Sequence, residues 1–413
     1  MRILEGAAAR KAVAALASRE PVPNPKIEKT VATIVGNVRR KGDRALRTYA
    51  EKFDGLEKGQ PVQVTRAELQ QAVRGISKDF IRAVETAAKN IRQFAEWQMP
   101  KPFVRSIAPG IRVGQKVEPL ESVGCYAPGG RYPLPSTVLM TAIPAQVAGV
   151  RRIQVASPRP APETLAAAAI IGVTEFFRIG GAQAVAAFAY GTESVPKVAK
   201  IVGPGNSFVT SAKRRVAFDA SIDFLAGPTE IVYVAHQGDP AFVASDLVAQ
   251  AEHDPETLPI FITSKRTFAA SVAREATRQA RGNAIAAKSL NTNGVALVAR
   301  DRHEAMDWAN RIGGEHITVA PEDVEQVRNA GSIFVGDYSP QSVGDYASGP
   351  NHTLPTGNVA RHRGGLSVLD YVKIISIQEL SRSGLKRIAR TVTLLAEAEG
   401  LKAHANSVRV RLK

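Results

Sequence analysis

Cysteine is the scarcest residue type in this sequence of 413 residues, with Cys125 as its single example. One thiol excludes an internal disulfide framework and every zinc site built from several thiolates. Cys125 lies near the end of a predicted strand, Ser122–Tyr126, where an unpaired cysteine is usually a small buried side chain. A nucleophilic role for this thiol is therefore disfavoured.

The sequence also lacks a long apolar run. The longest weakly polar stretch, Val138–Val150, is interrupted by Thr141, Pro144 and Gln146 and is too short to span a bilayer. Charged residues interrupt the alanines near the N-terminus, so no secretory signal is predicted. With 44% hydrophobic and 22% charged residues, the composition is that of a soluble globular protein, and we expect a cytoplasmic protein with no membrane partner.

The formal charge of +16 suggests a nucleic acid as one possible partner. However, the longest unbroken basic runs are only Arg39–Lys41 and Lys213–Arg215, and no helix-turn-helix, zinc-finger or RNP-like signature is present. Scattered positive charge can equally hold an anionic cofactor or substrate. We therefore rank nucleic-acid binding well below an enzymatic function.

Short β-branched segments alternate with alanine-rich helical segments from about Arg112 onward. Such alternation is typical of βαβ units and a parallel sheet. A linker-like stretch, Ala226–Thr229, separates two series, so we predict an α/β fold with two incomplete Rossmann-like modules. Strands are predicted at 122–126, 152–156, 175–179 and 200–202 in the first series, and at 231–235, 259–263, 295–298, 316–319 and 332–335 in the second.

Helical segments precede and follow the two series. A chain of this length is expected to form two or three domains. A helical arm is predicted at 1–22, ending at a proline-rich break, with longer helical stretches at 27–53 and 66–97. Near the C-terminus we expect a helix at 377–399 and an extended basic end at 407–413.

Three glycine-rich turns follow predicted strands and precede predicted helices: APGGR at 127–131, IGGAQ at 179–183 and VGPGN at 202–206. Ligands of open α/β sheets bind at this carboxyl edge, and glycine lets backbone N–H groups approach a phosphate. The fingerprint G-x-G-x-x-G is absent, because Phe208 stands where its third glycine would be. The pattern favours a nucleotide site built from several turns, although tight turns alone would explain any one of them.

The segment GDYASGPNHTLPT, Gly344–Thr356, has too many glycines and prolines for a helix or a central strand. It carries Asp345 and His352, which can bind metals or transfer protons, and loops often carry functional residues. A connector whose aspartate caps a turn and whose histidine faces solvent is an equally good interpretation of this segment alone.

Two further pairs of residues can support chemistry. Gln250 and His253 lie three positions apart at the end of a predicted helix and share one face, where an imidazole and an amide oxygen suit zinc. Glu315 and His316 follow a glycine pair at the start of a predicted strand and could divide general-base and general-acid work. For either pair in isolation, structural or solvent-facing side chains are the commoner interpretation.

Taken in order, a set of motifs covering essentially the whole chain resembles those of histidinol dehydrogenase. The set is YAPGGR, IGGAQA, VGPGN, IDFLAGPTE, QAEHD, GGEHI, GDYASGPNHTLPT and AEGLKAH. Two positions depart from the family pattern. Thr229 stands in GPTE where serine is usual, and Leu134 stands in GGRYPLPS where an aromatic residue is usual.

The resemblance implies a role for each matching residue. One zinc ion per subunit would be bound by Gln250, His253, Asp345 and His404. Glu315 and His316 would be the catalytic pair, and NAD would contact Tyr126, Gln183 and Asn206. Substrate would contact Thr229, His352 and Glu399, together with Gln250, His253, His316, Asp345 and His404.

The resemblance also implies a domain arrangement. Residues 23–125 and 234–370 would form a larger α/β domain with the zinc and catalytic residues, and residues 126–233 an inserted NAD-binding domain. The helical arm at 1–22 and a tail at 371–413 would pack across a homodimer. In the family, the tail's Glu and His complete the other subunit's site, which would give Glu399 and His404 that role here.

The activity that the resemblance implies is zinc-dependent oxidation of L-histidinol through L-histidinal to L-histidine with two NAD molecules, the final steps of histidine biosynthesis. His316 would take the alcohol proton as hydride passes to NAD, and Glu315 would activate water against the aldehyde. Two alternatives stay open at this point. One is a paralogous zinc- and NAD-dependent dehydrogenase for another polar alcohol, and the other is a basic nucleic-acid-binding protein.

Overall fold

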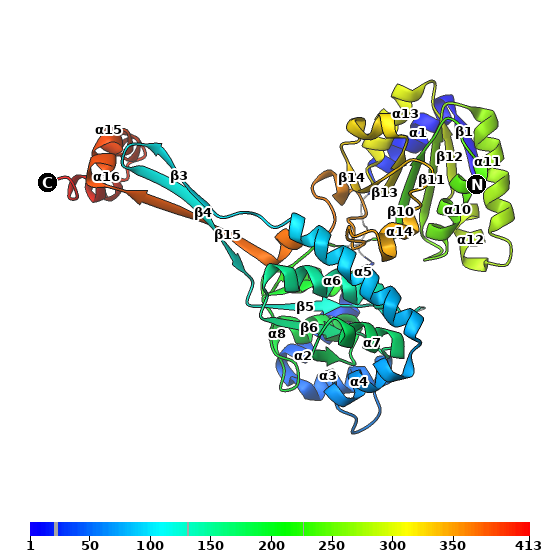
Figure 1. Ribbon diagram of the computed structural model, residues 1–413, viewed down its shortest axis with the longest axis horizontal. Coiled ribbons are helices and arrows are strands. Elements are labelled where there is room, and N and C mark those ends of the chain that lie inside the picture. The colour runs from blue at the N-terminus through cyan, green and yellow to red at the C-terminus, as the bar shows by residue number, and fades with distance from the viewer. Residues whose placement is uncertain (20–23, 130–131, 226) are drawn as a thin grey trace.

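The computed structural model describes residues 1–19, 24–129, 132–225 and 227–413. In these residues, two six-stranded sheets form two α/β modules, and a three-stranded ribbon carries the C-terminal helices away from them (Figure 1). The predicted fold class, α/β with two Rossmann-like modules, is confirmed. The proline-rich break at 21–23, the end of the APGGR turn at 130–131 and Ala226 of the linker lie outside the described residues.

The first module is built on a parallel sheet with the order β1-β12-β11-β10-β13-β14. Its strands are β1 (Arg2–Glu5), β10 (Glu230–Val234), β11 (Leu258–Thr263), β12 (Val295–Val298), β13 (Gly314–Val319) and β14 (Ala330–Val335). Its helices are α1 (Gly6–Ala17), α10 (Pro240–Ala251), α11 (Arg266–Gln279), α12 (Ala284–Thr292), α13 (Arg302–Ile312) and α14 (Gln341–Tyr346), with a 3-10 turn at Pro321–Gln326.

Helices cover both faces of this first sheet, because its strands are apolar on both sides. Helices α1 and α13 pack on one face, against side chains such as Val232 and Ile260. Helices α10 and α11 pack on the other, against Ile231 and Phe261. The predicted helical arm is therefore only partly helical, since β1 pairs with β12 and makes the chain's first residues part of the sheet.

The second module has the strand order β2-β7-β6-β5-β8-β9, with β2 antiparallel to β7 and the other neighbours parallel. Its strands are β2 (Gln63–Val64), β5 (Ser122–Tyr126), β6 (Arg152–Ala156), β7 (Glu175–Phe177), β8 (Lys200–Val202) and β9 (Ser221–Ile222). Its helices are α2 (Pro25–Lys41), α3 (Asp43–Tyr49), η1 (Ala50–Asp54, a π-helical turn), α4 (Arg66–Gly75), α5 (Lys78–Trp97), α6 (Pro135–Ala148), α7 (Pro162–Ile170), α8 (Gly181–Tyr190) and α9 (Ser207–Val216).

Local sequence explains where several of these helices begin. Asn24 accepts hydrogen bonds from the N–H groups of Lys26 and Ile27, and Pro25 supplies the first residue of α2. Thr65 and Glu68 form a reciprocal capping box at the start of α4. Helices α2, α3, α8 and α9 share one buried cluster, whereas α4, α6 and α7 share another on the opposite side of the sheet.

The grouping of the early helices differs from the predicted domain division. Residues 23–125 were expected to join 234–370, yet β2 pairs with β7, α2 contacts α8 and α9, and α5 contacts α6. The inserted unit therefore begins at α2 rather than at residue 126. An amphipathic helix can cover any parallel sheet, so its apolar stripe does not reveal which of two sheets it will cover.

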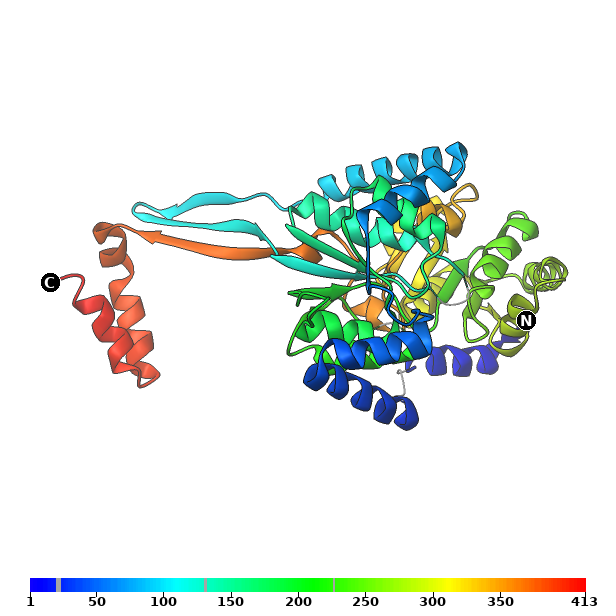
Figure 2. The same ribbon diagram turned by 90° about the horizontal axis from the view of Figure 1, so that it is seen from below.

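The ribbon consists of β15 (Val372–Leu380), β4 (Ile111–Pro119) and β3 (Phe103–Ala108), paired antiparallel in the order β15-β4-β3. It holds helices α15 (Arg382–Ala398) and α16 (Lys402–Arg409) far from both modules (Figure 2). The helix predicted at 377–399 begins only at Arg382, because Ser381 caps it and the preceding residues pair with β4. The extended end predicted at 407–413 is wrong, since α16 continues to Arg409.

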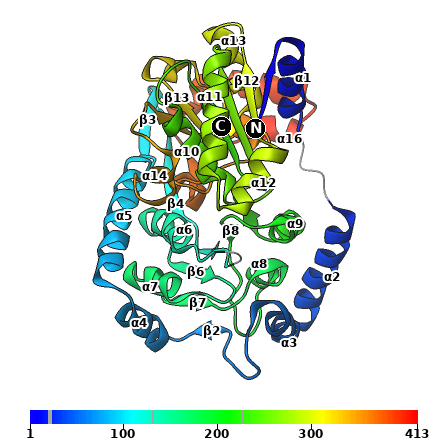
Figure 3. The ribbon, with the colours of Figure 1, turned by 90° about the vertical axis from the view of Figure 1, so that its right-hand side faces the viewer.

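The two modules lie against each other, with α10–α13 over α6, α8 and α9 in the view of Figure 3. Contacts between them come from the segment after β14, where Asn351 Nδ2 donates to the carbonyl of Met140 in α6 at 2.6 Å. No helix among the described residues has the length and apolar character needed to cross a membrane.

Candidate active site

The predicted acid–imidazole pair lies at the amino end of β13, where Glu315 and His316 are both buried. His316 Nδ1 is 3.8 Å from Glu315 Oε2, and His316 Nε2 is 3.6 Å from Asp345 Oδ1. The sheet thus brings the pair together with a residue from the glycine-rich segment that the sequence placed in a separate motif.

The backbone of Glu230, the first residue of β10, contacts both members of the pair. Its N–H donates to Glu315 Oε2 at 3.0 Å, and its carbonyl oxygen is 3.3 Å from His316 Nδ1. A carbonyl can only accept, so Nδ1 carries the proton in the neutral imidazole. The other nitrogen, Nε2, is buried without a hydrogen-bond partner among the described residues. Its lone pair is then available to accept a proton.

Burial controls the protonation of this pair. Removal from water raises the pKa of Glu315 to about 8, although the neighbouring His316 acts in the opposite direction. Burial alone would lower the pKa of His316, but the carboxylates of Glu315 and Asp345 raise it above its ordinary value. A carboxyl group that titrates above its usual range can act as a general base and a proton donor near neutral pH.

The glycine-rich segment is a bent connection rather than a solvent-facing loop. Its first residues belong to the end of α14, which corrects the expectation that the segment contains no helix. Gly349 has φ of +116°, and a Cβ there would lie 3.1 Å from the carbonyl oxygen of Asn90, so glycine is needed. His352 Nδ1 donates to the carbonyl of Asp345 at 2.7 Å.

His352 also joins the two modules. Its Nε2 is 3.2 Å from Thr137 Oγ1, at the start of α6. Burial lowers the pKa of His352, which favours the neutral imidazole, so Nε2 accepts from the threonine hydroxyl while Nδ1 donates to Asp345. This residue therefore lies on the boundary between the Glu315–His316 pair and the second module.

A cavity of about 280 Å³ lies beside these residues. It is lined by His316, Phe334, Asp345, Ser348, Asn351 and His352, among others. Its walls combine an aromatic ring with imidazole, carboxylate and amide groups, a mixture suited to a small polar molecule.

Gln250 lies in the last turn of α10, whereas His253 follows the helix, which ends at Ala251. Gln250 is buried and its Nε2 donates to Asp345 Oδ2 at 3.3 Å, whereas His253 is exposed. Gln250 Oε1 is a buried oxygen without a hydrogen-bond partner among the described residues. An amide oxygen in that position beside a carboxylate fits a metal with nitrogen and oxygen ligands.

The remaining predicted metal ligand, His404, is not near this group. It lies on α16, and Glu399 lies at the end of α15, both exposed on the tail beyond the ribbon. Across the described residues, no cluster of three or more His, Cys, Asp and Glu side chains is arranged to hold a metal. Within one chain the predicted set of zinc ligands is thus incomplete. Thr229, which was predicted to contact substrate, is partly buried and directly precedes Glu230.

The three residues predicted to contact NAD follow strands of the second sheet. Tyr126 ends β5, Gln183 is in the first turn of α8 after β7, and Asn206 caps α9 after β8. From β5 the chain continues to β6 and β7 on one side of that strand, and then returns to β8 on its other side. Strands β5 and β8 therefore flank the point where the strand order reverses, which is where open α/β sheets bind ligands. The Tyr126 hydroxyl accepts from the N–H of Gly181 at 3.1 Å.

Sequence reasoning missed the residues that support the site. Asp54, buried at the end of η1, accepts from Gln183 Nε2, and Glu230 contacts Glu315 and His316 through its backbone. Glu230 is the last residue of the quoted GPTE motif, which was the available signal for it. Asp54 has no comparable signal, because its partners lie more than a hundred residues away along the chain.

The fold and site define the class of this protein: a two-module α/β enzyme with Rossmann-like sheets and a buried carboxylate–imidazole pair. The histidinol dehydrogenase family model matches residues 17–412. Histidinol dehydrogenase of Methanosarcina barkeri is 48% identical over 398 residues, which are 93% of this chain and 92% of that protein. The enzyme of that name from Aquifex aeolicus is 44% identical over 405 residues, 96% and 95% of the two chains.

A solved structure gives the same result. The crystal structure of histidinol dehydrogenase from Elizabethkingia anophelis has a TM-score of 0.95 and 33% identity to this chain, covering 100% of this chain and 98% of that one. The chain therefore belongs to the histidinol dehydrogenase family, and it is an NAD-dependent oxidoreductase.

Proposed function

We propose that this enzyme oxidises L-histidinol to L-histidine through L-histidinal, in two successive steps that each use one NAD. The observation that carries the proposal is the buried Glu315–His316 pair beside Asp345 and a cavity of about 280 Å³. A hydroxyl carbon and then an aldehyde hydrate must each lose a proton as hydride departs, and the pair supplies two groups that can take protons.

His316 is the base for the alcohol. Its Nδ1–H is held by the carbonyl of Glu230, which leaves Nε2 facing Asp345 without a partner among the described residues. In the neutral form of His316, which its raised pKa makes a stronger base, Nε2 takes the hydroxyl proton as the alcohol becomes an aldehyde. Bound NAD would supply the hydride acceptor for each of the two oxidations.

Glu315 is the base for the second step. Its carboxylate is oriented by the N–H of Glu230 and takes a proton from the water that adds to the aldehyde. Loss of a second hydride from the resulting hydrate gives the carboxylic acid. The pKa of Glu315, raised to about 8 by burial, makes its carboxylate a stronger base than an exposed one.

We further propose a zinc site formed by Gln250, His253 and Asp345 from one subunit and His404 from a second copy. The support is the buried, unpartnered Gln250 Oε1 beside the Asp345 carboxylate, and a donor set of nitrogen and oxygen. Bound zinc would fix the imidazole and amine of the substrate, which is the template role of a metal. His352, Glu399 and Thr229 would complete the contacts to substrate.

The NAD site is proposed at the carboxyl edge of the second sheet, with Tyr126, Gln183 and Asn206. The support is their position around the switch point between β5 and β8. A Cβ on Gly203 would lie 2.1 Å from the Tyr126 carbonyl, so the turn after β8 packs closely on the end of β5. Close backbone approach of this kind is a common feature of dinucleotide sites.

A homodimer with shared active sites follows from the same proposal. The ribbon and tail expose large apolar side chains, and surfaces of this kind usually mark an interface. The exposed residues are Phe103, Val104, Ile107, Ile374, Ile375, Leu380, Leu394, Leu395, Leu401 and Val410. Pairing two copies through these surfaces would cover them and bring Glu399 and His404 to the site of the other copy.

The test is NADH formation from L-histidinol by the purified protein, with and without a chelator. A panel of other amino alcohols and diols, assayed in parallel, separates histidinol oxidation from the alternative of a different polar alcohol. We expect the highest kcat/KM with L-histidinol. Inactivity towards L-histidinol with saturating zinc and NAD would refute the proposal.

A further inference from the structure

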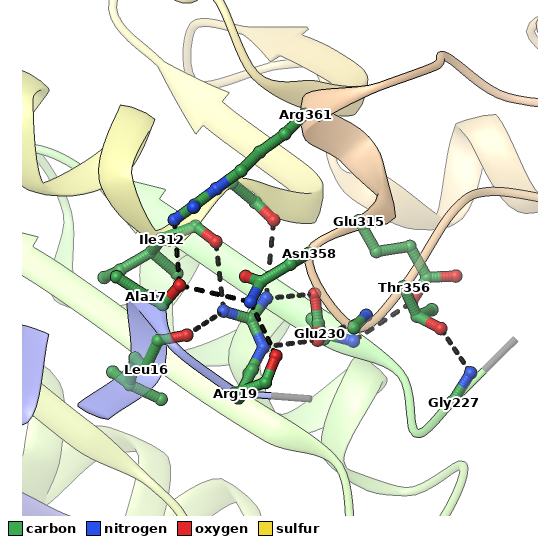
Figure 4. Close-up of polar contacts among 12 residues, drawn as sticks. Leu16, Ala17, Arg19, Gly227, Glu230, Ile312, Glu315, Thr356, Asn358 and Arg361 are labelled. Atoms are coloured by element: carbon green, nitrogen blue, oxygen red, sulfur yellow. Dashed lines mark hydrogen bonds and ion pairs between the residues drawn. The ribbon is translucent and has the colours of Figure 1, made fainter. Parts of the chain in front are cut away.

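A buried ion pair lies directly behind the proposed catalytic residues. Arg19 follows α1, and its guanidinium makes two parallel hydrogen bonds to the carboxylate of Glu230 (Figure 4). The distances are 2.7 Å for Nε–Oε1 and 2.5 Å for Nη2–Oε2. The Glu230 side chain is 2% exposed and the Arg19 side chain 15%. This two-point geometry is the strong form of the arginine–carboxylate contact.

The pair is held in place on all sides. Arg19 also donates to the carbonyl oxygens of Leu16, Ile312 and Gly313, and the N–H of Gly357 donates to Glu230 Oε1 at 2.9 Å. The Arg19 carbonyl in turn accepts from Asn358 Nδ2 at 2.6 Å. Every polar group of the Arg19–Glu230 contact therefore has a partner, which a buried charge pair requires.

The consequence lies in the backbone of Glu230. Its N–H orients Glu315 Oε2, and its carbonyl sets the tautomer of His316. We propose that Arg19 and Glu230 are positioning residues for the oxidation: the ion pair anchors the start of β10, and β10 in turn holds Glu315 and His316 in their reactive geometry. This inference rests on the proposed roles of those two residues.

Arg19 has a second effect through charge. Glu315 is faced by His316, by the Glu230 carboxylate and by Asp345, and the two carboxylates both disfavour its ionisation. Arg19 neutralises the charge of the Glu230 carboxylate. Loss of Arg19 leaves an unpaired anion behind Glu315, whereas loss of the Glu230 charge leaves an unpaired cation, so the two changes act on Glu315 in opposite directions.

The experiment measures kcat, KM and the pH dependence of kcat for Arg19→Met, Arg19→Lys, Glu230→Gln and the double variant Arg19→Met/Glu230→Gln. We expect Arg19→Met to lower kcat about 10- to 100-fold, with the KM values for L-histidinol and NAD within about threefold of wild type, because misplacement of a reacting group acts mainly on the chemical step. Arg19→Lys should be intermediate, since it keeps the charge but not the planar fork.

The double variant and the pH profile separate positioning from folding. The double variant buries no unpaired charge, so it should recover part of the kcat lost in Arg19→Met. The pH at half-maximal kcat should move up in Arg19→Met and down in Glu230→Gln. The matched control is Arg302→Met, which breaks a contact to the buried carboxylate of Asp323, 2.9 Å away, without touching Glu315 or His316.

The outcomes for the two proposals are distinct. An inactive wild-type protein contradicts the proposed function. An active wild type together with an Arg19→Met variant that has wild-type kcat and pH profile, as Arg302→Met should have, contradicts the positioning role alone. If Arg19→Met does not fold, Arg19→Lys and the double variant provide the same comparison. An unchanged kcat in both would overturn the inference.

Discussion

The Asp54 carboxylate and the Gln183 amide form a buried hydrogen bond, with Gln183 Nε2 2.9 Å from Asp54 Oδ2. The same oxygen accepts from the N–H of Gly180 at 2.9 Å. Asp54 belongs to η1, far from Gln183 in sequence, so this contact ties the outer helical layer of the second module to a turn that we propose as part of the NAD site.

Replacing Asp54 with alanine should weaken NAD binding. The change leaves two buried donors without an acceptor and frees the turn that holds Gln183, which should cost about 1–3 kcal/mol of folding stability. We expect the KM for NAD to rise about tenfold, a change of ~1.4 kcal/mol. Steady-state kinetics with varied NAD and a thermal melt would measure both effects.

Asp219→Ala serves as the control for this variant. The Asp219 carboxylate accepts a hydrogen bond from the Tyr190 hydroxyl in the same module, at 3.0 Å. It should lower stability slightly and leave the KM for NAD unchanged. A folded Asp54→Ala protein with a wild-type KM for NAD would disprove the link between this hydrogen bond and the cofactor.

The raised pKa of Glu315 predicts opposite effects of pH on activity and stability. Burial raises that pKa to about 8, above the ordinary value, so the folded state favours the protonated form. Stability from this group is complete below the unfolded pKa and is lost as pH rises towards 8. Catalysis needs the ionised form, so kcat should instead rise with pH across the same window.

Glu315→Gln separates these two effects. The amide cannot ionise, so the variant should gain stability relative to wild type, by up to a few kcal/mol, as pH rises from 5 to 9. It should also lose about 10²–10⁴-fold in turnover of L-histidinal. Melting curves and L-histidinal kinetics across this range provide the test, and a stability difference that does not change with pH would contradict the assignment.

Metal removal should stop turnover and lower thermal stability. Among the proposed ligands, Gln250 is on α10, His253 follows the end of that helix and Asp345 is on α14, so a bound ion would link these two helices. A ligand at a hundredfold excess over its Kd adds ~2.7 kcal/mol to the free energy of unfolding. Zinc titrated into chelator-treated protein should therefore raise the Tm as well as restore NADH formation.

In Asp345→Asn, added zinc should neither raise the Tm nor restore NADH formation. His303→Asn changes an exposed histidine on α13 and is the matched control. In this variant, added zinc should still raise the Tm and restore NADH formation. A Tm that rises equally with zinc in wild type and Asp345→Asn would place the metal elsewhere.

Mixing two inactive variants tests the shared site. Glu315→Gln and His404→Asn homodimers should each have almost no activity towards L-histidinal, which is the substrate for this assay. In a mixed dimer, one of the two sites combines an intact Glu315 with an intact His404. Random exchange makes half of the dimers mixed, so activity should recover to about a quarter of wild type. No recovery after proven subunit exchange would show that the tail does not act across the dimer.

Much of the alternating core could be predicted from local sequence. The strands at Ser122–Tyr126, Arg152–Ala156, Lys200–Val202 and Val295–Val298 end at the predicted residues, because β-branched runs bounded by turn residues leave little choice. The strands of the ribbon were harder to predict from the sequence. Val372–Leu380 joins smoothly to a helix-forming sequence, and only its pairing with β4 makes it a strand.

Some residues of the proposed site could likewise be predicted from the sequence, and others could not. Glu315, His316, Asp345 and His352 could be singled out because their residue types can carry out chemistry, and the structure brings them together. Arg19 could not. Its role depends on a carboxylate more than two hundred residues away and on backbone groups, and no local pattern encodes either.

The pairing of β1 with β12 sets an order for folding during synthesis. All strands of the second module lie between residues 63 and 222, so that sheet can close while residues beyond 230 are still being made. Arg2 pairs beside Val295, and its strand must wait until that residue has emerged from the ribosome. Closing so long a loop is costly in entropy, but the folded second module holds much of the intervening chain compact.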